Sequence, residues 1–345
     1  MVLNTRYKKI GKAALLLSPV RKVARNQILD EIRSGKIKIV ETNCPQCQHQ
    51  ESERISEVDF FGLPTTVSVC LDCGLVYSSR RMSDESLKKI YSHTLYGQID
   101  RGSPEPRSSN FERSFLKGEN IFHQIMAMQL HLKIQNVLDI GCGTGGVLSY
   151  FKSRGCSVTG LDLGYENIQF GRNQHGLNLF CSDINDLDDI PKSPTYFDLV
   201  ILEQTLEHFS DPISTLQLLR KRLKPDGLLY IGVPGFLNIR DQYDGDLLRY
   251  IQFPHLVHFS LTSLKSVLGR AGFRVIWGTE SISVIAQSSS TKVPQVHHDF
   301  KPILDYVAEL KSEFWSMRRI AKRILITHPI YFLGYLRALY TGKSH

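Results

Sequence analysis

The chain has 345 residues, 42% of them hydrophobic, with seven cysteines and a formal net charge of +8. This length allows one domain of about 200 residues plus smaller units, and no apolar run of about 18 residues or convincing signal peptide is present, so we expect a cytoplasmic enzyme. The charge is +8 in residues 1–40 and +6 in residues 311–345, which leaves −6 elsewhere. This distribution argues against a globally basic groove for nucleic acid and leaves two basic ends suited to an anionic surface.

Residues 1–40 are predicted to form a basic helical segment. An apolar patch at residues 13–17 and a helical pattern from Arg21 to Ile32 are surrounded by lysines and arginines. Two interpretations remain open: a helix that lies on a membrane or a partner, and a solvated helix packed on its own domain.

Residues 41–80 contain two pairs of cysteines that predict a zinc ribbon. Cys44 and Cys47 are followed after 22 residues by Cys70 and Cys73. Four thiolates on two knuckles suit tetrahedral zinc and leave no open coordination position, so we expect a structural ion. A redox dithiol and an iron site are the alternatives.

Residues 81–135 are predicted to be a helical connector with a mobile loop. Ser83 occupies a helix-capping position before acidic residues. Glycine, serine, proline and charge between Tyr96 and Asn110 indicate a loop or linker. A helix is expected from Glu112 to Leu132.

Residues 136–286 alternate strand and helix, which predicts a Rossmann-like α/β domain with a parallel sheet covered on both faces. The strand-like run that begins at Val137 ends in a turn with Gly141, Gly143 and Gly146. Such a turn needs glycine where the backbone adopts positive φ or approaches a ligand. With Asp162 about 20 residues further on, the spacing also satisfies the dinucleotide fingerprint. The glycines alone therefore do not separate NAD from another adenosine cofactor.

Asp139 favours S-adenosylmethionine (SAM), because a carboxylate at the strand end repels a pyrophosphate and attracts a cationic amino acid. Here the chain resembles the class I SAM-dependent methyltransferases. Their motifs match five segments in order: 137–145, 158–162, 181–184, 197–208 and 223–231. The resemblance assigns cofactor binding to Asp139, Gly141, Cys142, Gly143, Gly145, Asp162, Leu163, Asp183, Ile184 and Glu203.

A zinc ribbon ahead of such a domain is similar to the methyltransferases with an N-terminal putative zinc-binding domain, which include sugar C-methyltransferases. Many of these proteins are associated with polysaccharide or natural-product pathways. The resemblance makes His255 the candidate base, with His208 as a second candidate. Pro254 replaces the acid that precedes the family's histidine, which makes O-methylation as good an interpretation as C-methylation. Residues 238–250 are expected to form an acceptor-binding insert.

Residues 287–345 are predicted to be a linker and basic amphipathic helices that meet a membrane, the domain or a second copy of the chain. The leading hypothesis is methyl transfer to a hydroxyl or carbon of a small polar acceptor, either a nucleotide-linked or a lipid-linked sugar, without nucleic acid. The alternatives are an RNA methyltransferase, a non-catalytic SAM-binding scaffold and an NAD-dependent oxidoreductase. The oligomeric state is left open.

Overall fold

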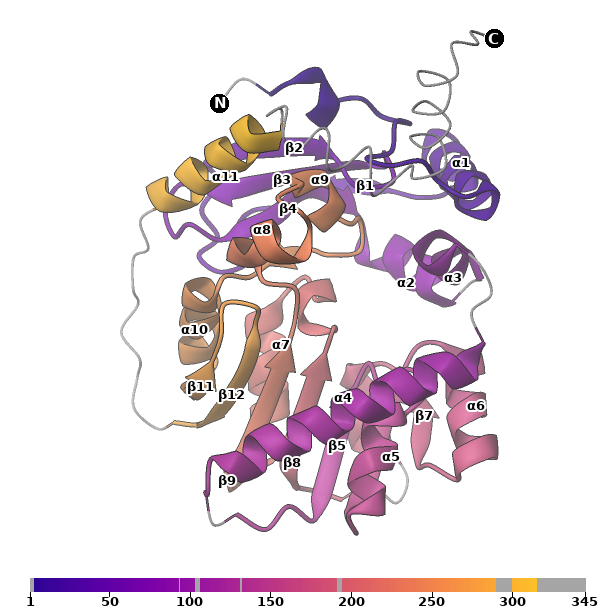
Figure 1. Cartoon of the computed structure of the whole chain (residues 1–345), viewed down its shortest axis with the longest axis vertical. Helices are drawn as coiled ribbons and strands as arrows, with labels where there is room; N and C mark the ends of the chain where they lie inside the picture. Colours follow the sequence, from indigo (N-terminus) through magenta and orange to yellow (C-terminus); the bar gives the residue numbers. More distant parts are fainter. Residues whose placement is uncertain are drawn as a thin grey trace, which may run out of the picture.

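The computed structural model describes residues 3–92, 94–102, 106–130, 132–190, 194–289 and 300–314. Within these residues the chain forms a large lobe around a seven-stranded sheet and a small lobe around a five-stranded sheet (Figure 1). The predicted basic tail from residue 315 onward lies outside the described residues. None of the described helices combines the length and the apolar character that crossing a bilayer requires.

The large sheet has the strand order β11-β12-β9-β8-β5-β6-β7 in the described chain, and β12 alone runs antiparallel to its neighbours. Its strands are β5 (Asn136–Ile140), β6 (Ser157–Asp162), β7 (Leu179–Cys181), β8 (Phe197–Glu203), β9 (Leu223–Gly232), β11 (Phe273–Gly278) and β12 (Ser283–Ser288). The chain runs outward from β5 to β7 and then returns to β8 beside β5. The strand order therefore reverses between β5 and β8, which is where open α/β sheets bind ligands.

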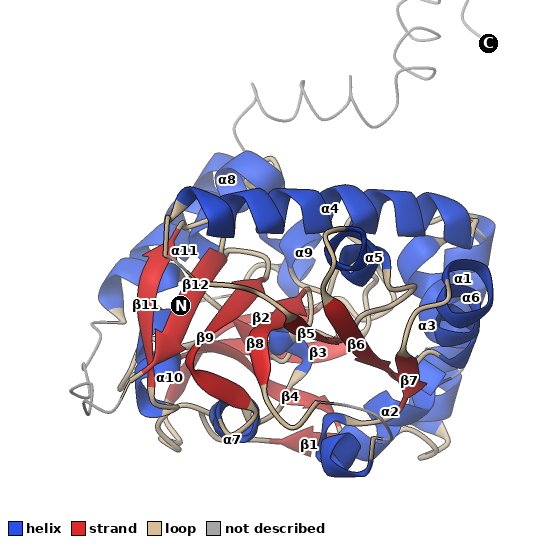
Figure 2. Cartoon of the chain, turned by 90° about the horizontal axis from the view of Figure 1, so that it is seen from below, coloured by secondary structure: helices blue, strands red, loops and turns tan. Residues whose placement is uncertain are grey.

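Helices cover both faces of this sheet, which confirms the predicted Rossmann-like α/β fold (Figure 2). Because neighbouring residues of a strand point to opposite faces, Val137 packs with one set of helices and Leu138 with the other. On one side lie α4 (Arg107–Ala127), α5 (Gly146–Ser153) and α6 (Tyr165–His175), and on the other α7 (Pro212–Arg220) and α10 (Leu261–Arg270).

The small sheet consists of β1 (Ile39–Glu41), β2 (Ser52–Val58), β3 (Pro64–Cys70), β4 (Val76–Met82) and β10 (Val257–His258). Its last strand comes from the loop between β9 and α10 of the large lobe. Val257 pairs with Tyr77 near the start of β4, whereas Ile39 of β1 pairs with Met82 at its end. A segment of the large lobe thus completes the sheet of the small lobe.

Short helices precede the small sheet and connect it to the large lobe. They are η1 (Thr5–Tyr7), α1 (Pro19–Arg33), α2 (Asp84–Ser92) and α3 (Thr94–Arg101). The predicted cap of α2 is confirmed, since the Ser83 hydroxyl accepts a bond from the Ser86 amide at 3.3 Å. The loop predicted from Tyr96 to Asn110 is wrong, because α3 occupies its first part and α4 begins at Arg107. Burial of Ile99 and a bond from Arg21 Nε to its carbonyl show that packing against α1 overrides the weak local signal.

The predicted acceptor-binding insert packs against the small lobe. It contains η4 (Phe236–Asn238), α8 (Ile239–Gln242) and α9 (Leu247–Tyr250), and α11 (Lys301–Phe314) lies beside it. Asp246 caps α9 and forms an ion pair with Arg6, and Asp244 pairs with Arg249. Neither carboxylate lines the large cavity described below, so the expected role of this insert in holding the acceptor is not supported.

Candidate active site

The glycine turn after β5 adopts the backbone conformation that its sequence predicts. Gly141, Gly143 and Gly145 have φ values of 75°, 55° and 81°, in the left-handed region that favours glycine. An added Cβ at Gly141 would collide with the side chain of Thr205, whereas one at Gly143 would meet no atom within 4 Å. The turn therefore leaves open space directly over the backbone of Gly143, beside the N-terminus of α5.

Asp162 ties this turn to the end of β6. One carboxylate oxygen accepts a bond from the Gly143 amide at 2.9 Å, and the other accepts one from the Gly164 amide at 2.7 Å. Each carboxylate oxygen has a second lone pair available for a ligand hydroxyl. Burial raises the pKa of Asp162, and the two backbone bonds oppose that shift. The arrangement holds an acceptor of hydrogen bonds rigidly at the sheet edge.

Two further carboxyl groups are buried beside this turn. Asp139 is only 2% exposed, and its Oδ1 has no hydrogen-bond partner among the described residues. Burial raises its pKa well above the usual value, with a further contribution from the charges of Glu203 and Asp162. Glu203, at the end of β8, contacts Lys117 of α4 at 3.0 Å, while its Oε2 has no partner in the described part of the chain. The carboxylate oxygens without a partner, Asp139 Oδ1 and Glu203 Oε2, fit the cationic methionine portion of SAM.

A cavity of about 2310 Å³ opens at this edge of the sheet. Six of the residues singled out from the sequence line it: Gly141, Asp162, Leu163, Asp183, Ile184 and His208. Asp139, Cys142, Gly143, Gly145, Glu203 and His255 are not among the lining residues. The Asp183 carboxylate already caps η2 (Ile184–Asp189) and contacts Lys88 of α2 at 2.7 Å.

His208, at the end of η3 (Leu206–His208), faces the cavity with a defined tautomer. Its Nδ1 lies 2.8 Å from the carbonyl oxygen of Pro254 and 2.8 Å from the hydroxyl of Tyr91. A carbonyl oxygen only accepts hydrogen bonds, so Nδ1 must carry the proton. In the neutral ring Nε2 is then the unprotonated nitrogen, which is the form that a general base requires.

Burial lowers the pKa of His208 to about 4, which keeps the ring neutral at physiological pH. The backbone carbonyls of Pro254 and Gln204 act in the opposite direction because they favour the charged ring. These carbonyls would stabilise the imidazolium that forms when His208 takes a proton.

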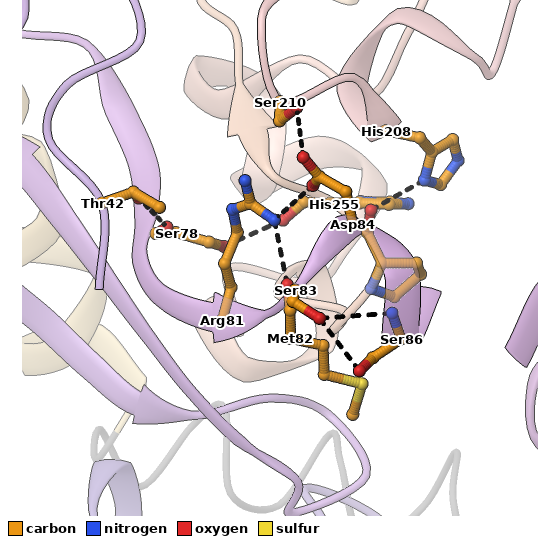
Figure 3. Close-up of polar contacts among 11 residues, drawn as sticks. Thr42, Ser78, Arg81, Met82, Ser83, Asp84, Ser86, His208, Ser210 and His255 are labelled. Carbon is orange, nitrogen blue, oxygen red and sulfur yellow. Dashed lines mark hydrogen bonds and ion pairs between the residues drawn. The ribbon is translucent and has the colours of Figure 1, made fainter. Parts of the chain in front are cut away.

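His255 lies behind His208, and its ring centroid is 5.1 Å from that of His208. The small lobe holds its backbone: Ser78 donates its hydroxyl to the His255 carbonyl at 2.9 Å (Figure 3), and the Asp59 carboxylate accepts a bond from the Phe253 amide at 3.1 Å. Burial, together with the neighbouring histidines His208 and His258, lowers the pKa of His255 well below its usual value. The structure therefore brings both predicted histidines together, with His208 between His255 and the cavity.

Glu207 is the third polar member of this cluster. It is 2% exposed, and neither carboxylate oxygen has a hydrogen-bond partner among the described residues, although Oε1 lies 3.9 Å from Nε2 of His208. Burial raises its pKa to about 8. Donor atoms of Glu207, His208 and His255 lie within 4.8 Å of one another. A protonated carboxyl group and two neutral imidazoles thus share one buried space.

Further polar contacts join the lobes around this cluster (Figure 3). Asp84 at the start of α2 accepts a bond from Arg81 at 2.6 Å and another from Ser210 of the large lobe at 3.0 Å. The Gln46 side chain, between the first two cysteines, donates to Ser266 of α10 at 3.0 Å. These bonds hold the small lobe and α2 against the large lobe beside the site.

The four cysteines of the small lobe converge as predicted. Their sulfur atoms lie within 4.8 Å of one another, and the pairs Cys44–Cys73 and Cys47–Cys70 are each 3.5 Å apart. Four sulfurs at 2.3 Å from one zinc ion are about 3.8 Å apart. Each knuckle ends in a left-handed residue, Gln48 with φ of 63° or Gly74 with φ of 71°. The donor set and its spacing fit a tetrahedral zinc ion.

Three residues of the site have no local signal in the sequence. Tyr91 and Lys117 lie on helices far along the chain from their partners His208 and Glu203. Gln204, which lines the cavity, has a positive φ of 53° at the end of β8. Such strain in a residue other than glycine is typical of functional sites, but only the structure reveals it.

Comparison with known proteins agrees with this geometry. A family model described as a methyltransferase domain matches residues 99–277. The chain belongs to this methyltransferase family. The predicted class, a class I SAM-dependent methyltransferase, is thereby supported by both family and fold.

Two curated relatives of this methyltransferase are named ubiquinone biosynthesis O-methyltransferase. The protein from Yersinia enterocolitica is 35% identical over 128 residues, which are 33% of this chain and 52% of the relative. The protein from Actinobacillus pleuropneumoniae is 36% identical over 104 residues, 28% of this chain and 44% of the relative. The chain spans about half the length of these curated relatives.

Among solved structures, Burkholderia thailandensis 1,6-didemethyltoxoflavin-N1-methyltransferase is 16% identical, with a TM-score of 0.44 over 63% of this chain and 96% of that one. This likeness is too distant to bear on the acceptor.

Proposed function

We propose that this protein transfers the methyl group of SAM to a hydroxyl group of a small polar acceptor of the sugar class. The observation that carries the proposal is the position of His208. A neutral imidazole whose tautomer is fixed by the Pro254 carbonyl lines the same cavity as Asp162, the residue that resembles the ribose-binding acid.

SAM would supply an electrophilic methyl group on a sulfonium. The ribose hydroxyls would donate to Asp162, and Asp139 with Glu203 would accept the cationic methionine portion. His208 Nε2 would accept the proton of the acceptor hydroxyl as the oxygen attacks the methyl carbon in line. His255, and Glu207 whose Oε1 lies 3.9 Å from the same Nε2, would position the His208 ring.

Two observations favour oxygen over carbon as the methylated atom. The relatives that match are named O-methyltransferases. In addition, Pro254 stands where an acid would orient His255, and its carbonyl binds His208 instead. The polar wall of the cavity near His208, which includes Gln204, Thr205 and Ser210, supports a hydroxylated acceptor such as a nucleotide-linked or lipid-linked sugar.

We also infer that the four cysteines bind structural zinc. The support is the tetrahedral spacing of their sulfurs and the absence of an open position in a four-thiolate shell. The ion would hold the β3–β4 hairpin, on which β10 and the histidines depend.

The test is calorimetric titration of the full-length protein with SAM and with NAD, followed by transfer of labelled methyl groups to nucleotide sugars and lipid-linked glycans. We expect SAM to bind in the micromolar range and NAD not to bind. Asp226→Ala, an exposed substitution near the start of β9, is the control for the folded protein. Binding of NAD alone would refute the cofactor. SAM binding without transfer to any hydroxylated acceptor would favour a scaffold, and transfer to RNA alone would replace the acceptor class.

A further inference from the structure

The surface formed by Lys8, Lys9, Ile10, Lys12, Leu16, Val20, Lys22 and Val23, here called the N-terminal surface, combines exposed aliphatic side chains with lysines. Leu16 is 74% exposed, Val23 66%, Ile10 54% and Val20 39%. Val20 and Val23 lie three residues apart on one face of α1, so their side chains are neighbours. A group of large aliphatic side chains exposed together on one surface is typical of a binding site.

The backbone beneath these side chains is well anchored. Tyr7 and Leu17 are buried, and the adjoining face of α1 buries Ala24 and Ile28. The Gly11 amide donates to the Gly62 carbonyl at 2.8 Å. The Gly11 carbonyl accepts a bond from Arg25 of α1 at 2.9 Å, which places the turn around Ile10 beside the helix. The fold therefore presents the aliphatic groups outward on a fixed platform.

The charge of this platform is of one sign. Residues 3–29 contain seven lysines and arginines and no aspartate or glutamate. Arg6 is paired with Asp246, but within the described chain Lys8, Lys9, Lys12 and Lys22 are exposed and form no ion pair. Aliphatic groups among unpaired lysines are complementary to a bilayer with anionic headgroups. Aromatic side chains, which stack on bases in single-stranded nucleic acid, are absent from the N-terminal surface.

We propose that the N-terminal surface binds an anionic lipid bilayer and presents the active site to acceptors anchored in it. Val20 belongs both to this surface and to the lining of the large cavity, together with Gly97 and Gln98 of α3. Ser18 Oγ donates to the Gly102 carbonyl at 3.2 Å, which fixes α1 against α3 at this mouth of the cavity. A polar headgroup carried on a lipid would enter beside Val20 while its chains remain in the membrane. The presentation of the active site to lipid-anchored acceptors rests on the proposed methyl transfer, whereas binding of the bilayer does not.

The test is co-sedimentation of the full-length protein with vesicles of phosphatidylcholine alone and of phosphatidylcholine mixed with phosphatidylglycerol. We expect binding to the anionic vesicles only, weakening as salt is added. Leu16→Ser/Val23→Ser should lower the affinity roughly tenfold, and Lys8→Gln/Lys9→Gln should lower it by about tenfold to thirtyfold. All four positions are exposed, so the substitutions leave the core intact.

Matched controls come from other surfaces. Leu116 of α4 is 57% exposed, and Lys133 and Lys265 are exposed away from α1. Leu116→Ser and Lys133→Gln/Lys265→Gln should bind vesicles like the parent. Residues 315–345 stay in every variant, so unchanged binding by the N-terminal variants would overturn the proposal. Binding of heparin or RNA without any binding of anionic vesicles would overturn it as well.

The outcome is separable from that of the proposed function. The surface variants should retain SAM affinity and methyl transfer to a soluble acceptor, and lose transfer only to the same acceptor on anionic vesicles. Asp162→Ala should still bind vesicles. Failure of SAM binding in the parent would therefore refute the enzyme assignment, and equal transfer to vesicle-held acceptor by parent and surface variants would refute the delivery role.

Discussion

The carbonyl oxygen of Pro254 lies 2.8 Å from Nδ1 of His208 and so decides which nitrogen of that ring carries the proton. Pro254 belongs to the loop before β10, which pairs with β4 of the small lobe, so the tautomer of His208 depends on how that loop docks on the small sheet. His208→Gln should lower kcat by about 10²- to 10⁴-fold, the usual contribution of a general base. The affinity for SAM should stay within about twofold. Steady-state kinetics with calorimetry checks both, and an unchanged kcat would leave His208 a structural residue.

His255→Ala should lower kcat less than His208→Gln does, because His255 lies behind His208 and does not line the cavity. SAM affinity should again be intact. Burial lowers the pKa of His208, and the His255 ring is part of what buries it, so the acidic limb of the kcat profile should move to higher pH in the variant. Equal activity and an unmoved profile would show that His255 only fills space.

Asp162→Ala should weaken SAM binding by at least about a hundredfold, because hydrogen bonds to a carboxylate contribute about 1.5–3 kcal/mol each. The fold should persist, since β6 remains buried on both faces. Calorimetry with SAM measures the affinity, and circular dichroism with Asp226→Ala as reference checks the fold. Unchanged affinity in Asp162→Ala would contradict the cofactor assignment.

Glu207→Gln should stabilise the protein more at pH 8 than at pH 5. Burial raises the folded pKa of Glu207 from 4.5 to about 8. Between these values the unfolded chain is ionised while the folded protein keeps its proton, so the free energy of unfolding falls as pH rises. Glutamine does not ionise, so the variant should not lose this stability, which is on the order of a few kcal/mol of unfolding free energy. Urea unfolding at both pH values measures the free energy of unfolding of the parent, of Glu207→Gln and of the exposed control Glu112→Gln. A difference between Glu207→Gln and the parent that does not grow with pH would contradict the prediction.

Cys70→Ser should remove bound zinc and loosen β10, because Cys70 ends β3 and the β3–β4 hairpin pairs with Val257. The zinc content should fall below one ion per chain, and hydrogen exchange should accelerate at the Ser78 amide, which donates to the Leu256 carbonyl at 2.9 Å. The exposed Cys181→Ser should change neither. Retention of zinc by Cys70→Ser would refute the four-thiolate site.

The large sheet and the glycine turn could be predicted because their signals are local. The strand before Gly141, the glycine spacing and Asp162 are consequences of one βαβ unit, and the structure places them together. The convergence of the four cysteines could also be predicted, because it follows from two short motifs with two cysteines each. The helix α3 was missed because its stability comes from packing of Ile99 on α1, which no local pattern reports.

The histidine cluster was predicted only in part. His208 and His255 were identified as alternatives, and their contact depends on β10 crossing to β4. The contacts of Tyr91 with His208 and of Lys117 with Glu203 could not be predicted for the same reason, because tertiary folding brings each pair together. Long-range pairing of this kind leaves no periodic trace in either segment.

The division of one edge of β4 between β1 and β10 also bears on how the protein is made. Tyr77 leaves the ribosome about 180 residues before its partner Val257. During that interval the first half of β4 has an uncovered edge, which invites pairing with other chains. We therefore expect a fragment that ends after α3 to aggregate, and zinc supply early in synthesis to matter for yield.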